Sequence, residues 1–133
     1  MTNRIIVNNI RKIDLAKEQG FYLEALLRAY HVNVSLLKYI LEQGSEKTTS
    51  ENHKPGNLLK SLVKARKKNP GLKSLIGSQS LKSVRIWLDK SDKYFKTLKI
   101  RQPYNTKRLL DESTRICSML NVSVSKASLG ARS

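Results

Sequence analysis

The side chains of this sequence that could carry out catalysis are few and isolated. His31 is expected on the polar side of a helix, His53 in a loop, and the single cysteine, Cys117, on an apolar helical face. A cysteine nucleophile needs a base within reach, and the sequence suggests none beside Cys117. The acidic residues are too scattered to form a catalytic pair of carboxylates. We therefore expect binding without catalysis, and a catalytic role for either histidine remains the alternative.

Patterns that hold metals or cofactors are also missing from the sequence. It contains no cysteine pair, no His-x-x-x-His and no Asp-x-Asp cluster of the kind that ligates a metal ion. The glycines at 56, 71 and 77 stand alone at expected helix ends, so they do not form a phosphate-binding loop. We expect neither a metal nor a cofactor.

Positive charge is the most informative property of the composition. The 133 residues include 26 Lys and Arg against 10 Asp and Glu, which gives a net charge of +16. Residues 54–108 alone carry 16 basic and 2 acidic residues, whereas the segments 1–53 and 109–133 are each close to neutral at +1. A block this one-sided repels itself and is usually matched by a polyanion. Nucleic acid is the favoured partner; an acidic protein, membrane headgroups or no specific partner are the alternatives.

The candidate nucleic-acid-binding residues are the cations of this block, because phosphate neutralisation requires only correctly placed positive charges. No helix-turn-helix with base-reading side chains is evident, so RNA or single-stranded DNA is favoured over sequence-specific duplex recognition, and RNA over DNA. Tyr94 and Tyr104 flank the region of these cations and are candidates for base stacking, with packing at the core or its edge as the alternative. The candidate cations are Lys60, Lys64, Arg66, Lys67, Lys68, Lys82, Arg85, Lys93, Lys96, Lys99 and Arg101.

Helical periodicity provides the elements that would position these side chains. In the stretch 81–99 the residues Leu81, Val84, Trp87, Leu88, Ser91, Phe95 and Leu98 share one arc, while Lys82, Arg85, Lys93 and Lys96 share the opposite arc. Four further helices are expected over residues 3–19, 21–43, 57–69 and 105–120. Within 21–43, the stripe expected to face the core is Leu23, Leu26, Leu27, Tyr30, Val34, Leu37 and Leu41, with Val32, Leu36 and Tyr39 beside it. The fold class is therefore all-α, a single-domain bundle of about five helices.

Turn-forming residues mark the boundaries of the domain. Residues 44–56 lack a hydrophobic period and predict a mobile loop, and Asn57 is the expected N-cap of the helix that follows. Pro70 and Gly71 predict its end, and residues 72–76 a short turn. The bundle is expected to span 1–120, with 121–133 as a flexible Ser-rich tail. With neither a membrane span nor a signal peptide evident, and a single cysteine, we expect a cytoplasmic location.

Three stretches together resemble the HEPN superfamily of small helical domains found in prokaryotic toxins, antiviral systems and RNA-processing machines. GFYLEALLRAYHVNVSLLKYILEQG (20–44) is similar to the family's long helix, HKPGNLLKSL (53–62) to the entry of its next helix, and VRIWLDKSDKYFKTL (84–98) to the helix that carries its catalytic Arg and His. In the third stretch Ser91 stands at the Arg position, Asp92 at the polar position and Lys96 at the His position. Lysine is a poor proton shuttle at that position unless it is strongly desolvated.

The resemblance therefore implies a degenerate member that binds or scaffolds nucleic acid instead of cutting it, with a homodimer or a subunit of a larger complex as the expected assembly. We expect an accessory subunit of a larger nucleoprotein, such as a CRISPR-associated, phage or mobile-element assembly. One alternative is a ribonuclease of HEPN type that uses His31 or His53 in place of the missing base. A second is a basic protein-interaction module or inhibitor that docks on an acidic surface.

Overall fold

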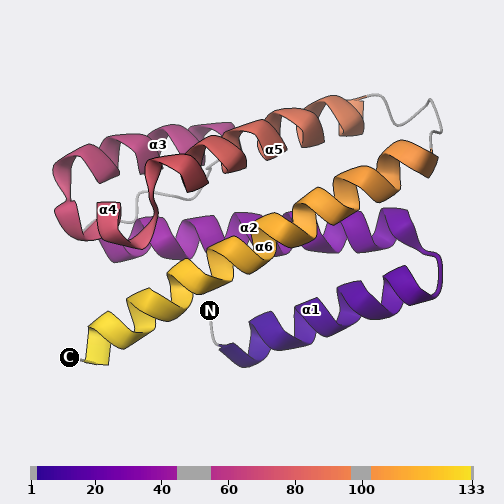
Figure 1. Cartoon of the computed structure of the whole chain (residues 1–133), viewed down its shortest axis with the longest axis horizontal. Coiled ribbons are helices and arrows are strands. Elements are labelled where there is room, and N and C mark those ends of the chain that lie inside the picture. Colours follow the sequence, from indigo (N-terminus) through magenta and orange to yellow (C-terminus); the bar gives the residue numbers. More distant parts are fainter. Residues whose placement is uncertain (1–2, 45–54, 97–102, 133) are drawn as a thin grey trace.

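The chain folds as a bundle of α-helices in the computed structural model, which describes residues 3–44, 55–96 and 103–132. These residues form α1 (Asn3–Glu18), α2 (Tyr22–Gly44), α3 (Pro55–Lys68), α4 (Pro70–Leu75), α5 (Ser78–Lys96) and α6 (Pro103–Arg132). The described ranges contain no strand, so the all-α bundle is confirmed, with five long helices and the short α4 (Figure 1).

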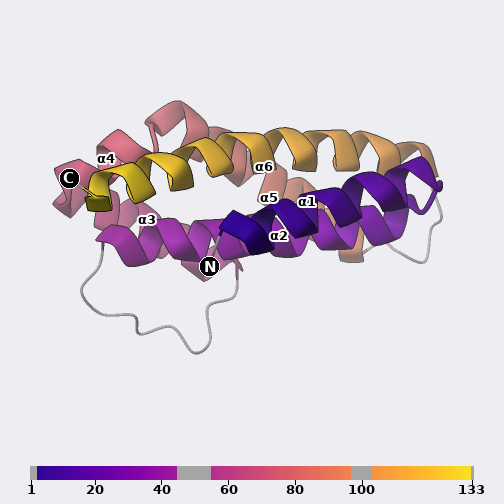
Figure 2. The ribbon, with the colours of Figure 1, turned by 90° about the horizontal axis from the view of Figure 1, so that it is seen from below.

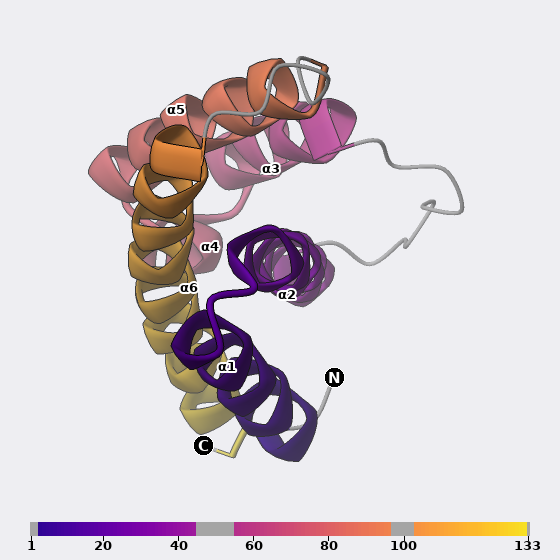
Figure 3. The same ribbon diagram turned by 90° about the vertical axis from the view of Figure 1, so that its right-hand side faces the viewer.

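Helix α2 lies at the centre of the bundle. It packs most extensively against α6 and also contacts α1, α3 and α4. Viewed end-on, α3 and α5 lie on one side of α2, α1 on the other, and α6 closes a third side (Figure 3). Its central position follows from its composition, because a helix that is apolar over so wide an arc can bury side chains against several neighbours.

The core-facing side of α2 differs from the predicted stripe. Leu23 and Leu27 were expected in the core, but they are 44% and 40% exposed. Ala25 and Ala29 are fully buried in their place, together with Leu36 and others. The helix carries leucines on most of its circumference, so hydrophobicity alone does not determine which side faces the core. The small side chains of Ala25 and Ala29 allow neighbouring helices to approach closely, and this side is therefore the buried one.

The α3–α4–α5 connection is a tight reversal. Asn69 caps α4, because its side-chain oxygen accepts hydrogen bonds from the backbone N–H groups of Gly71 (2.9 Å) and Leu72 (3.4 Å), and Pro70 occupies the first turn. Most of the turn expected at residues 72–76 is therefore helical. The prediction that Asn57 is the N-cap of α3 is wrong, because the helix begins at Pro55 and contains Asn57 in its first turn.

Helix α6 continues well beyond the predicted end of the domain. It crosses α2 diagonally in Figure 1, runs beside α2 in Figure 2, and extends to Arg132. Ser123 and Val124 are only 6% and 2% exposed, so the expected boundary at residue 120 is wrong and the Ser-rich segment is helical. The serines predicted a turn or a flexible segment. Ile116, Leu120 and Val124 are each four residues apart, however, and this spacing keeps one face of the helix on the core. Within the predicted loop 44–56, residues 45–54 lie outside the described residues.

Candidate nucleic-acid interface

A buried hydrogen-bond network fixes the orientation of α5. The indole Nε1 of Trp87 donates to Ser113 Oγ of α6 at 2.7 Å, and Ser113 Oγ in turn donates to the Leu109 carbonyl oxygen at 2.7 Å. Asn33 of α2 donates through Nδ2 to the Ser113 carbonyl oxygen at 3.0 Å, and Ser91 Oγ donates to the Trp87 carbonyl oxygen at 2.8 Å. These directional bonds hold the inner side of α5 on the core, so the opposite side of the helix faces solvent.

The predicted inner stripe of α5 is confirmed over the residues that the structure describes. Its fully or nearly buried members are Leu81, Val84, Trp87, Leu88 and Ser91, and Phe95 is partly buried beside Tyr30, with ring centroids 5.3 Å apart. Leu98 lies outside the described residues. Ser91, which the resemblance aligns with the HEPN arginine, is thus part of the core, whereas Lys96, which it aligns with the histidine, is exposed.

The outward sides of α3 and α5 carry most of the predicted cations. The two helices lie side by side in one layer over α2 (Figures 1 and 3). We define the basic face as the predicted cations that are exposed in this layer: Lys60, Lys64, Lys67 and Lys68 of α3, and Lys82, Arg85, Lys93 and Lys96 of α5. The structure therefore brings eight of the eleven predicted cations to one side of the bundle. Lys99 and Arg101 lie outside the described residues.

Arg66 has a different role from the other predicted cations. It is partly buried, and its Nε donates a 2.9 Å hydrogen bond to the carbonyl oxygen of Ile76. Ile76 is the C-cap of α4, so this bond fastens the end of α3 to the segment that leads into α5. Arg66 thereby supports the basic face from within the fold.

Most cations of the basic face have no anionic partner among the described residues. Lys93 pairs with Asp89 one turn earlier, at 3.2 Å, and both side chains are well exposed. The other ion pairs in the described ranges involve cations that are not members of the basic face: Lys17 with Asp111, Arg28 with Glu24, and Lys90 of α5 with Glu112 of α6. The charge on Lys64, Lys82 and their neighbours is therefore available to an external anion.

Tyr94 is a packing residue in this structure. Its hydroxyl is hydrogen-bonded to Thr106 Oγ1 of α6, and its ring meets Phe95 edge-to-face at 5.7 Å. The phenol is partly buried, which matches the packing alternative and not the stacking role. Tyr104 belongs to α6, but its side chain lies outside the described ones.

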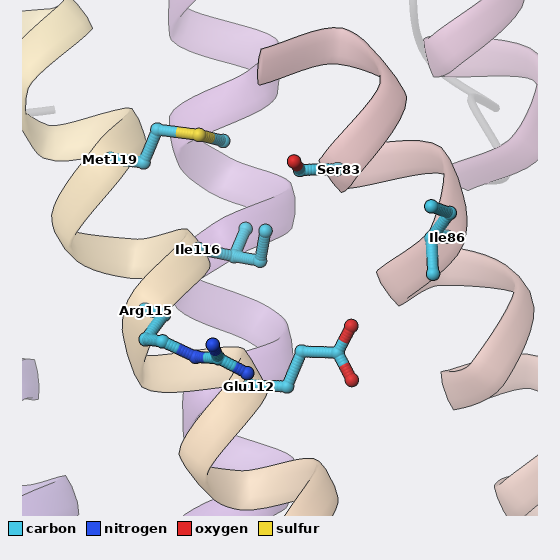
Figure 4. Close-up of a pocket in the computed structure, with 6 residues that line it drawn as sticks. All are labelled: Ser83, Ile86, Glu112, Arg115, Ile116 and Met119. Carbon is cyan, nitrogen blue, oxygen red and sulfur yellow. The ribbon is translucent and has the colours of Figure 1, made fainter. Parts of the chain in front are cut away.

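A shallow groove between α5 and α6 was not predicted from the sequence. It encloses about 280 Å³. Ile86, 44% exposed, forms part of its wall, although the periodicity of α5 assigned this residue to neither the apolar nor the basic arc. An isoleucine among lysines was the available signal. The close-up in Figure 4 shows the lining residues, which are Ser83, Ile86, Glu112, Arg115, Ile116 and Met119.

A second hollow, of about 180 Å³, lies between α1 and α2. It is lined by Asn9, Arg28, His31, Val32 and Ser35. Arg28, His31 and Ser35 share the polar side of α2, because they are three and four residues apart. His53 lies outside the described residues.

Cys117 is buried in the core, as its apolar helical position predicts. Desolvation, with a smaller contribution from the negative charge of Asp14, raises the pKa of the Cys117 thiol to about 11. A buried neutral thiol is a poor nucleophile. Within the described ranges, no three His, Cys, Asp or Glu side chains gather as metal ligands, and no helix is long and apolar enough to cross a bilayer.

Comparisons with protein-family models, curated proteins and solved structures found no match. The HEPN resemblance therefore stays a prediction.

Proposed function

We propose that this chain is a non-catalytic nucleic-acid-binding module, and that the basic face on α3 and α5 is its binding surface. The observation that carries the proposal is the gathering of eight exposed cations on one layer of the bundle, most of them without an acidic neighbour among the described residues. Such a surface neutralises phosphates, and the release of condensed counterions then favours binding.

RNA or single-stranded DNA is the proposed ligand, with RNA preferred. The exposed side of α5 between Lys82 and Lys96 lacks asparagine and glutamine, which pair with adenine edges in the major groove. Contacts to the phosphate backbone therefore dominate, as they do in accessory subunits that hold a strand for another component. A degenerate HEPN-like subunit of a CRISPR-associated, phage or mobile-element complex, acting in the cytoplasm, fits this description.

Charge reversal on the basic face tests the proposal. Lys64→Glu combined with Lys82→Glu removes one cation from each helix and should weaken binding of single-stranded RNA by about tenfold or more. For a single strand, the loss of two phosphate contacts should also reduce the slope of log K against log salt by about 1.4. Fluorescence anisotropy at several salt concentrations measures both quantities.

The matched control is Arg11→Glu with Lys12→Glu on α1. Both cations are exposed on α1, which lies on the other side of α2 from α3 and α5 (Figure 3), and the substitution changes the net charge by the same amount. We expect the control to retain most of the affinity. An equal loss in both variants, or unchanged binding in the first, would refute the proposed surface.

A metal-independent ribonuclease is the second candidate, because one observation favours it. Arg28 and His31 line the same hollow, so a proton-transferring imidazole and a phosphate-stabilising guanidinium are close to each other. Cleavage of single-stranded RNA in the presence of a chelator, abolished by His31→Ala and retained by His53→Ala, would favour the enzyme. The absence of cleavage by the unmodified protein would reject it.

A further inference from the structure

The groove between α5 and α6 adds an apolar element to the edge of the basic face. Ile86, Ile116 and Met119 supply aliphatic and thioether surface, while Ser83, Glu112 and Arg115 supply polar atoms at its sides (Figure 4). Ile86 connects the groove to the basic face, because Lys82 of that face stands one helical turn before it on α5. A ligand that lies along α5 would therefore meet positive charge and an exposed apolar wall together.

The polar atoms of the groove retain hydrogen-bonding capacity. Ser83 Oγ donates to the Gln79 carbonyl oxygen at 3.2 Å, so its lone pairs can still accept. Glu112 is held by Lys90, whose Nζ lies 3.1 Å from Oε2, and its carboxylate can also accept further bonds. Arg115 is exposed and contributes donors. Donors and acceptors beside an apolar wall suit a flat heterocycle that has both an apolar face and a polar edge.

The size of the groove restricts its occupant. Sites for drug-sized ligands enclose about 300–1,000 Å³, and this groove lies just below that range. An amphipathic helix would need a continuous row of apolar anchors over several turns. The position of the groove beside Lys82 and the other cations of the basic face instead favours a small ring system that is attached to an anionic chain.

We propose that this groove receives one unpaired base of a single strand whose phosphates lie on the basic face. The inference rests on the proposed function and adds selectivity to it. In a duplex the bases are already paired and stacked, and extracting one costs free energy. The groove would therefore make the protein prefer single strands, which the positive charge alone does not achieve.

The experiment compares two RNA strands of about eight nucleotides, a length within the site sizes of single-strand-binding folds. One strand is oligouridylate, and the other is its abasic analogue, which keeps the phosphates and lacks the bases. The unmodified protein should bind oligouridylate about tenfold more tightly than the abasic strand. Ser83→Trp, which fills the groove with an indole, should erase this preference and leave the affinity for the abasic strand unchanged.

Leu15→Trp is the matched control. It introduces the same side chain at an exposed position on α1, where Leu15 is 52% exposed, and it should retain the preference. If Ser83→Trp does not fold, as judged by circular dichroism, Ile86→Ser serves as the second variant, because it removes apolar wall from an exposed position. The preference should then fall while affinity for the abasic strand stays the same.

The possible failures are distinguishable. Equal binding of both strands by the unmodified protein would overturn the base-binding groove and leave the basic face intact as the interface. Absence of binding to either strand would overturn the proposed function and the groove together. A preference for oligouridylate that survives unchanged in the groove variant would also overturn the inference, because the bases would then be bound elsewhere.

Discussion

Trp87 Nε1 of α5 donates a 2.7 Å hydrogen bond to Ser113 Oγ of α6, and both residues have zero solvent exposure. The bond joins the largest buried side chain to a polar group that would otherwise be costly to bury. Because Asn33 of α2 also bonds to the Ser113 backbone, three helices meet at this point. The rotation of α5, and hence the direction in which its cations point, depends on this contact.

Ser113→Ala should destabilise the fold by about 1–3 kcal/mol, because it leaves the buried indole N–H without its acceptor. Urea denaturation followed by circular dichroism measures the change in the free energy of unfolding. Combining it with Trp87→Phe gives a double-mutant cycle, and we expect a coupling energy above about 0.5 kcal/mol. Strictly additive effects would show that the bond contributes nothing specific. Ser118→Ala, at an exposed position of α6, is the control and should be nearly neutral.

The sequence was sufficient to predict the fold where periodicity was unambiguous. In α5 the apolar and cationic residues occupy opposite arcs, so the buried stripe from Leu81 to Ser91 followed directly. In α2 apolar residues occupy most of the circumference, and the choice of Ala25 over Leu23 for the core depends on how closely neighbouring helices pack. The helical segment around Ser123 was missed because serine favours turns locally, whereas burial of Val124 against the bundle overrides that preference.

The candidate site was predictable in composition but not in detail. The positive block identified the side chains of the basic face, because exposed lysines need only a solvent-facing arc. The hydrogen bond between Arg66 and the Ile76 carbonyl oxygen depends on the reversal of chain direction through α4, which no local sequence pattern specifies. The groove beside Ile86 likewise depends on the relative placement of α5 and α6, which tertiary packing determines.

Arg66→Met should lower stability by about 1 kcal/mol, since it leaves the partly buried Ile76 carbonyl without its donor. Lys67→Met next to it should change stability by less than about 0.5 kcal/mol, because Lys67 is exposed and has no ion-pair partner among the described residues. Thermal and urea unfolding of the pair measures the difference. Equal stability of the two variants would mean that the hydrogen bond does not hold the α3–α4–α5 reversal together.

The stability of the protein should fall at alkaline pH because of Cys117. Burial raises the pKa of the folded thiol to about 11, whereas the unfolded thiol titrates near about 8.5. Between these two pH values the thiol loses its proton in the unfolded state but keeps it in the folded state, which favours unfolding. The protonated Cys117 thiol therefore contributes its full stabilisation below about pH 8.5, and this stabilisation is lost as pH rises toward 11. By pH 10.5 the loss of unfolding free energy attributable to Cys117 should reach about 2–3 kcal/mol. Lysines and tyrosines also titrate in this window, so the quantity to compare is the unfolding free energy of the unmodified protein minus that of Cys117→Ala, measured from pH 7 to 10.5. A difference that stays constant with pH would contradict the prediction.

Val124→Ala should destabilise the protein by about 1–3 kcal/mol, because it removes buried methyl groups from the part of α6 that lies beyond residue 120. Ser125→Ala is the matched control, since Ser125 is the exposed neighbour on the same helix and its change should be close to neutral or slightly stabilising. Equilibrium urea unfolding compares the two variants with the unmodified chain. Equal stability of all three proteins would show that the segment after residue 120 does not pack on the bundle in solution. A loss confined to Val124→Ala would establish that α6 contributes to the core as far as its sixth turn, because residue 124 lies 21 positions after Pro103 and a turn holds about 3.6 residues.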